Sequence, residues 1–170
     1  MRELVSRAIE RFLQSESSYL VESDLLPPDV MLRTAARDLQ KPLDELVEDL
    51  GAWLVRQNEI WRLLRFCGSD FLDFLLRLDE LPERMRLVTD DIAFPEIALT
   101  RGKDGLVWVT LESGSPRWSA LLSGLLRAMA DDYGALCVIT RGDDGIRIDV
   151  SDLDFAEART FRLSARTAAP

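Results

Sequence analysis

The spacing of apolar residues divides the chain into a helical first half and a mixed second half. Up to about Val88, apolar residues recur every three or four positions, which is typical of helices that bury one face. Proline or a capping residue opens several of these segments. The pattern predicts helices at Val5–Phe12, interrupted by the polar Gln14–Ser18, at Asp29–Leu39, from Pro42 to Leu54, at Ile60–Leu64, and from an N-cap at Ser69 through Leu78 toward Pro82.

After about Asp90 the apolar runs become short, and turn residues separate them. Two such runs flank Arg101–Gly105, and two more flank Gly142–Gly145, so each set predicts a β-hairpin. A long helical pattern lies between the hairpins and ends at Gly134. The predicted elements are strands at Ile97–Thr100 and Leu106–Leu111, a helix at Trp118–Tyr133, strands at Leu136–Thr140 and Ile146–Val150, and a last short strand at Phe161–Leu163.

This order of elements predicts an α+β fold, because the helices are segregated from antiparallel strands. We expect one domain, built from a helical N-terminal subdomain followed by a hairpin-helix-hairpin subdomain with an antiparallel sheet. The expected boundaries are 1–88 for the helical subdomain, 89–163 for the mixed α+β subdomain and 164–170 for a flexible tail.

The charge of the chain sets expectations about its partners and its location. The net charge is −9, so its surface repels phosphate backbones and anionic lipids, and we expect no nucleic acid and no membrane partner. No apolar run approaches the roughly 20 residues that span a bilayer. Its two cysteines, Cys67 and Cys137, are expected to be free, partly buried thiols, and the expected location is cytoplasmic.

The absence of histidine removes most ordinary catalytic chemistry. The sequence holds no histidine at all, so it lacks the commonest general base and transition-metal ligand. It also lacks glycine-rich phosphate motifs and paired cysteines. The acidic pairs Asp90–Asp91, Asp131–Asp132 and Asp143–Asp144 are interpreted as solvated turn residues rather than a metal site. We therefore expect no catalytic residues, no metal site and no enzyme activity.

From Leu43 to Leu163 the sequence resembles the heme-nitric oxide/oxygen binding (H-NOX) domain, a bacterial relative of the sensor domain of soluble guanylate cyclases. Three segments carry the resemblance: Leu50–Leu54 (LGAWL), Phe71–Leu81 (FLDFLLRLDEL, like F-L-x-x-L-x-x-L-D-x-L) and Ser113–Pro116 followed by Gly124–Leu126. Arg127–Leu136 further resembles a proteobacterial subgroup. The resemblance implies an H-NOX-like fold and a sensor function in signalling.

At the positions that would hold heme, the chain departs from the family. The family's proximal histidine follows L-D-x-L, and this position is Pro82 here. The family's Tyr-x-Ser-x-Arg motif corresponds to Leu111, Ser113 and Ser115, so only the serine is kept. The segment Leu13–Pro28 is also shorter than its counterpart in the family. We therefore expect no cofactor at this site.

The preferred hypothesis is a heme-free signalling domain that acts through protein interaction or through an alternative small apolar ligand. By the resemblance, its partner is a signalling protein such as a histidine kinase or a diguanylate cyclase. The alternative is a gas sensor that binds heme or another tetrapyrrole through a residue other than histidine. Met85 and Cys67 are the candidate substitute ligands, since heme proteins also use methionine and cysteine. We further expect Pro82 and Leu111 to help close the interior space.

Overall fold

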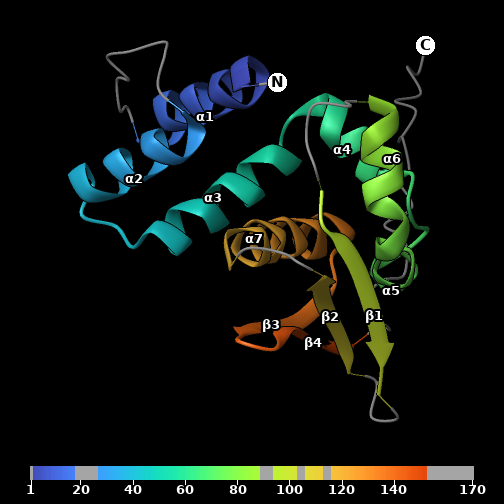
Figure 1. The fold of residues 1–170 in the computed structure, drawn as a ribbon. Coiled ribbons are helices and arrows are strands. Elements are labelled where there is room, and N and C mark those ends of the chain that lie inside the picture. The colour runs from blue at the N-terminus through green and yellow to red at the C-terminus, as the bar shows by residue number, and fades with distance from the viewer. Residues whose placement is uncertain (1, 18–26, 89–93, 103–105, 113–115, 153–170) are drawn as a thin grey trace, which may run out of the picture.

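The computed structural model describes residues 2–17, 27–88, 94–102, 106–112 and 116–152 (Figure 1). Helices form the first part of the described chain, and a helix flanked by two strand pairs forms the second. The elements are α1 (Arg2–Ser17), α2 (Pro28–Asp38), α3 (Leu43–Val55), α4 (Asn58–Arg65), α5 (Phe71–Leu76), the short 3₁₀ helix η1 (Leu78–Glu80), α6 (Leu81–Val88), β1 (Glu96–Arg101), β2 (Val107–Glu112), α7 (Pro116–Tyr133), β3 (Leu136–Gly142) and β4 (Gly145–Asp152).

The first three helices bury their apolar stripes against one another. Helix α1 continues to Ser17, so the interruption predicted at Gln14–Ser18 is wrong for its described part, Gln14–Ser17. Leu13, at the inner face of the helix, is fully buried and anchors this last turn. Prolines open α2 and α3, whose N-cap residues are Pro27 and Pro42. A buried cluster holds these helices together and consists of Ile9, Phe12, Leu13, Met31, Leu32, Ala35, Ala36, Leu46, Val47, Leu50, Trp53 and, from α7, Ala120.

Helix α5 begins one residue later than predicted. Its N-cap is Asp70 rather than Ser69, because the Asp70 carboxylate accepts the backbone N–H of Asp73 at 2.9 Å. The Asp73 carboxylate in turn accepts the backbone N–H of Ser69 at 2.9 Å. The predicted continuation toward Pro82 is broken into α5, η1 and α6. A 3₁₀ turn thus separates the two helices of this segment.

The four strands form one antiparallel sheet in the order β1-β2-β4-β3. Both predicted hairpins are confirmed, and in the second Gly142 pairs with Gly145, whose φ of +134° suits glycine. Strand β2 pairs with β4 through Trp108 and Arg147, which joins the two hairpins. The predicted strand at Phe161–Leu163 lies outside the described residues.

A larger apolar cluster joins the sheet to α7 and to the helices from α4 to α6. Its buried members are Val55, Leu64, Cys67, Phe71, Phe74, Leu75, Leu78, Leu81, Val107, Val109, Leu122, Leu126, Met129, Ala130, Ile146 and Ile148. In Figure 1, α7 lies between α3 and the sheet, while α5 and α6 stand beside β1. The α+β class is confirmed, and the subdomain boundaries stay a prediction. Among the described helices, none is long and apolar enough to cross a membrane.

Candidate functional site

The residue at the family's histidine position is buried at the start of α6. Pro82 is the second residue of this helix. Proline is tolerated there, because the first N–H groups of a helix have no intrahelical acceptor and the missing N–H of proline costs no hydrogen bond. Its neighbours Leu78 and Leu81 are 1% and 5% exposed, so this turn faces the larger apolar cluster. The proline ring has no atom that can bind a metal ion. Position 82 therefore offers apolar contact and no ligand.

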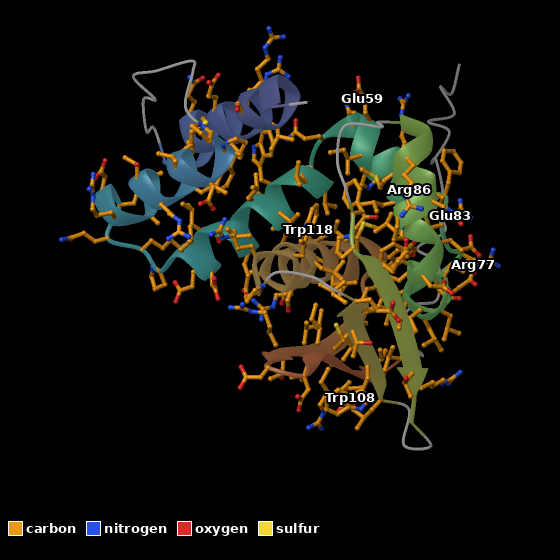
Figure 2. The ribbon with its side chains drawn as sticks, in the orientation of Figure 1. Glu59, Arg77, Glu83, Arg86, Trp108 and Trp118 are labelled. Atoms are coloured by element: carbon orange, nitrogen blue, oxygen red, sulfur yellow. The ribbon has the colours of Figure 1, made fainter. Side chains whose placement is uncertain are left out.

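Met85 lies about one turn beyond Pro82 on the same helix face. It is half-buried and packs against the larger apolar cluster. Arg86, one turn after Pro82, pairs with Glu96 of β1 at 2.7 Å, and Glu83 is exposed. Figure 2 labels both Glu83 and Arg86 on this helix. Helix α6 thus packs the Met85 side chain against the apolar cluster, while Glu83 and Arg86 are exposed to solvent.

The thiol of Cys67 is buried just after α4. The residue is 3% exposed, and its Sγ lies 3.2 Å from the carbonyl oxygen of Leu63, to which it donates a hydrogen bond. Burial raises the pKa of the Cys67 thiol, and the nearby charge of Arg84 offsets this in part. The thiolate is the form of cysteine that binds metal ions. Cys67 is therefore a neutral, hydrogen-bonded thiol in this structure. The prediction of two free cysteines is confirmed for Cys67 and Cys137.

Leu111 of β2 faces the interior of the molecule. It follows the buried residues Val107 and Val109 on the same face of the strand, and it pairs with Ile97 of β1. It is half-buried and packs against the larger cluster, where it presents only apolar surface. The other two residues of the motif, Ser113 and Ser115, lie outside the described residues. Cys67, Met85 and Leu111 thus meet at one cluster, beside the turn that carries Pro82.

A group of aromatic and charged residues that the sequence pattern did not predict lies next to this cluster. The hydroxyl of Tyr133, the last residue of α7, donates to the carbonyl oxygen of Gly68 at 2.9 Å. The guanidinium of Arg65 lies over the Tyr133 ring, 3.9 Å from its centroid, and pairs with Asp132. Trp61 donates its ring N–H to the same carboxylate at 2.9 Å. These contacts fix the α4–α5 connection against α7. The sequence did not predict them, because the helical spacing of the aromatic residues indicates only that they are buried and not which residues they contact.

Cation binding has little support in the described part of the chain. No group of three or more cysteine, aspartate or glutamate side chains gathers there in a way that could hold a metal ion. Asp143 and Asp144 are exposed in the β3–β4 turn, and Asp131 and Asp132 are exposed at the end of α7. Asp90 and Asp91 lie outside the described residues.

Comparison with solved structures identifies the fold as that of H-NOX domains. An H-NOX protein from S. oneidensis in the Fe(II) ligation state is 15% identical, with a TM-score of 0.69 over 89% of this chain and 97% of that one. The same protein in its Fe(II)NO state gives a TM-score of 0.65 at 14% identity, over 89% and 100% of the two chains. An oxygen-binding H-NOX domain related to soluble guanylate cyclases gives 0.61 at 11% identity, over 89% and 96%. None of the curated protein sequences matches the chain.

The sequence profile of the family described as Haem-NO-binding matches residues 28–140, more than half of the chain. The protein therefore belongs to the Haem-NO-binding (H-NOX) family. This finding corrects the expectation that the protein has no cofactor, because heme binding is the norm of the family and the similar structures are iron-ligated. The expectation rested on the residues at a few positions, such as Pro82 and Leu111. The chain nevertheless keeps the fold of the family.

Heme nevertheless does not fit this site in the way that the family's motif implies. An axial histidine is excluded, since the chain contains none and Pro82 has no donor atom. Leu111 offers no hydroxyl to a propionate group. Of the two candidate sulfur ligands, Met85 packs against the cluster, and the Cys67 thiol already donates to Leu63 and has its pKa raised by burial. The site thus keeps the apolar surface of the family's fold and lacks its histidine ligation.

Proposed function

We propose that this protein is a non-enzymatic sensor domain of the H-NOX family whose signal does not depend on an iron–histidine bond. The observation that carries the proposal is the buried Pro82 at the start of α6, in a chain without histidine. Any ligand change at this site must therefore reach α6 through packing against the Pro82 and Met85 face. Sensor domains of this family signal rather than catalyse, which supports the non-enzymatic assignment.

The readout of such a sensor is a protein partner, and we propose a signalling protein such as a histidine kinase or a diguanylate cyclase. The outward face of α6 supports this proposal. It carries the exposed Glu83 and Arg86, and Arg86 pairs with Glu96 of β1 (Figure 2). A shift of α6 would change this charged surface directly. Charged surface groups of this kind contribute to partner choice and to the association rate.

Two kinds of ligand remain to be distinguished. Heme held without histidine is the first, because heme is the group that the family binds and Met85 presents a thioether toward the cluster. Another apolar molecule is the second, and Leu111 favours it because the residue offers only apolar contact where the family has a tyrosine. Both ligands would be bound at the same surface of α6 and β2.

Titration of the purified protein with heme tests the proposal through the Soret absorbance band. The Pro82→His variant restores a nitrogen donor at position 82, so its affinity for heme should rise about tenfold or more, which corresponds to about 1.4 kcal/mol. Its ferrous spectrum should also become that of a histidine-ligated heme, unlike the wild-type spectrum. Met85→Leu and Cys67→Ser then show whether either sulfur contributes a ligand to the wild type.

Circular dichroism serves as the control that each variant folds. A Pro82→His variant that folds and binds heme with the same affinity and spectrum as the wild type would contradict the proposal, because position 82 would then not face the ligand. A wild-type protein that binds no heme but binds a small apolar molecule, with the binding abolished by Leu111→Glu, would identify the second kind of ligand.

A further inference from the structure

A pocket of about 370 Å³ lies away from the site just described, between α1, the α2–α3 turn and α3. Its apolar surface comes from Phe12, Leu39, Leu46 and Ala52. Phe12 and Leu46 are 1% and 3% exposed, so they form a fixed floor. This volume falls near the lower end of the ~300–1,000 Å³ that is usual for small-molecule sites.

Three charged residues surround this floor. Lys41 and Asp49 form an ion pair at one end of the pocket. Arg56, the C-cap residue of α3, also lines the pocket. Lys41 and Arg56 thus place two basic side chains around this floor, and Lys41 already interacts with a carboxylate, that of Asp49. A lysine that holds a carboxylate beside an apolar floor complements a molecule that has one anionic group and an apolar body.

The backbone fixes the position of Lys41 beside this floor. Helix α2 ends with Gln40 in the left-handed conformation, at a φ of +52°. The N–H of Gln40 bonds to the carbonyl of Arg37 at 3.1 Å, and that of Lys41 bonds to the carbonyl of Ala36 at 2.9 Å. This pair of bonds is the Schellman motif, which reverses the chain sharply at a helix end. Lys41 is thereby brought opposite Asp49, which lies eight residues further along the chain.

We propose that this pocket binds a small monocarboxylate with an apolar body. Its apolar part would lie on Phe12, Leu46 and Ala52, and its carboxylate would take the place of Asp49 beside Lys41. Asp49 is about half exposed, so its side chain can move to solvent when the ligand binds. The ligand and Asp49 therefore compete for one cation, and this competition makes the proposal testable.

The probe is octanoate, titrated into the full chain and followed by the NMR shifts of the Ala52 and Leu46 methyl groups. Saturable shifts at both methyl groups are expected in the wild type. Lys41→Gln should weaken octanoate binding by about threefold or more, and Asp49→Asn should strengthen it by a similar factor, as about 0.7 kcal/mol for a half-exposed ion pair implies. Octanamide, which has no charge, should bind more weakly than octanoate and respond to neither variant.

Arg147→Gln is the matched control, because it removes an exposed cation from the sheet, away from this pocket. It should leave octanoate binding unchanged. Ala52→Leu fills the pocket with a good helix former and should abolish the shifts at Leu46. The absence of saturation would overturn the proposal. So would an affinity that is the same in the wild type, Lys41→Gln and Asp49→Asn, since binding would then involve neither Lys41 nor Asp49. Heme titration of these same variants is an independent measurement, because none of the substituted residues belongs to the site of the proposed function.

Discussion

Gly124 of α7 packs directly against the backbone of Glu48 in α3. A Cβ atom on Gly124 would lie 1.8 Å from the carbonyl oxygen of Glu48. A Cβ on Gly51, in the facing helix, would lie 2.1 Å from the carbonyl oxygen of Leu121. Real Cβ contacts are never this short, so both positions require glycine for the two helices to touch. The contact joins the cluster of α1–α3 to the part of the molecule that carries the sheet.

Gly124→Ala should destabilise the protein by about 3 kcal/mol or more, because overpacking against backbone cannot be relieved by a side-chain rotation. Ser123→Ala is the matched control on the adjacent residue. Ser123 is fully buried, and its hydroxyl makes no hydrogen bond to the described residues, so its removal should cost less than about 0.5 kcal/mol. Urea unfolding of both variants gives the two free energies. A Gly124→Ala protein as stable as the control would show that the helices can separate at little cost.

The same interface holds an ion-pair network around Glu48. Its carboxylate pairs with Arg127 at 2.6 Å and with Arg141 at 3.3 Å, and Arg141 also reaches Asp44 at 2.8 Å. The Glu48 side chain is only 17% exposed, so solvent screens the network less than a pair on an open surface.

A double-mutant cycle with Arg127→Met and Glu48→Gln should give a coupling of about 1 kcal/mol. The same cycle on the exposed pair Arg77–Asp73 should give a smaller coupling, because solvent screens this i,i+4 pair. Raising the salt concentration to about 1 M should weaken the second coupling more than the first. Equal couplings would mean that the partial burial of Glu48 adds nothing.

Local sequence signals predicted most of the elements and little of what joins them. The Gly142–Gly145 hairpin and the end of α7 at Gly134 were predicted because the turn chemistry lies within a few residues. The close contact at Gly124 was not, because it depends on a helix more than seventy residues away. At the candidate site, the register of the L-D-x-L segment predicted the importance of Pro82, but only the structure shows that Leu111 and Cys67 join the same cluster.

Tyr133 should link the stability of the protein to pH in the alkaline range. Burial raises the pKa of its hydroxyl above the ordinary value of 10.0, and Arg65 offsets this in part. The folded state therefore keeps the proton that the unfolded state releases near pH 10. The contribution of Tyr133 to the free energy of unfolding is fully present below pH 10. It decreases as the pH rises from there through the higher pKa of the folded state.

Tyr133→Phe removes both this ionisation and the hydrogen bond to Gly68. At pH 7 the variant should be less stable than the wild type by about 1 kcal/mol, the usual value of one hydrogen bond. Above pH 10 the difference should shrink, because only the wild type loses stability through this group. Chemical unfolding at pH 7, 9, 10 and 11 gives the comparison. A difference that stays constant across this range would contradict the assigned direction of the pKa shift.

Gln40 and Gly134 occupy the same left-handed backbone conformation at two helix ends, with φ values of +52° and +69°. Glycine adopts this conformation without the steric cost that a Cβ atom brings, which is about 1 kcal/mol. Gln40→Gly should therefore stabilise the protein by up to about 1 kcal/mol, and Gly134→Ala should destabilise it by a similar amount. No atom outside the turn lies within 4 Å of the Cβ position at Gly134, so the second effect isolates the backbone cost. Thermal unfolding of both variants checks the opposite signs. A loss of stability in Gln40→Gly would show that the glutamine side chain contributes more than its backbone conformation costs.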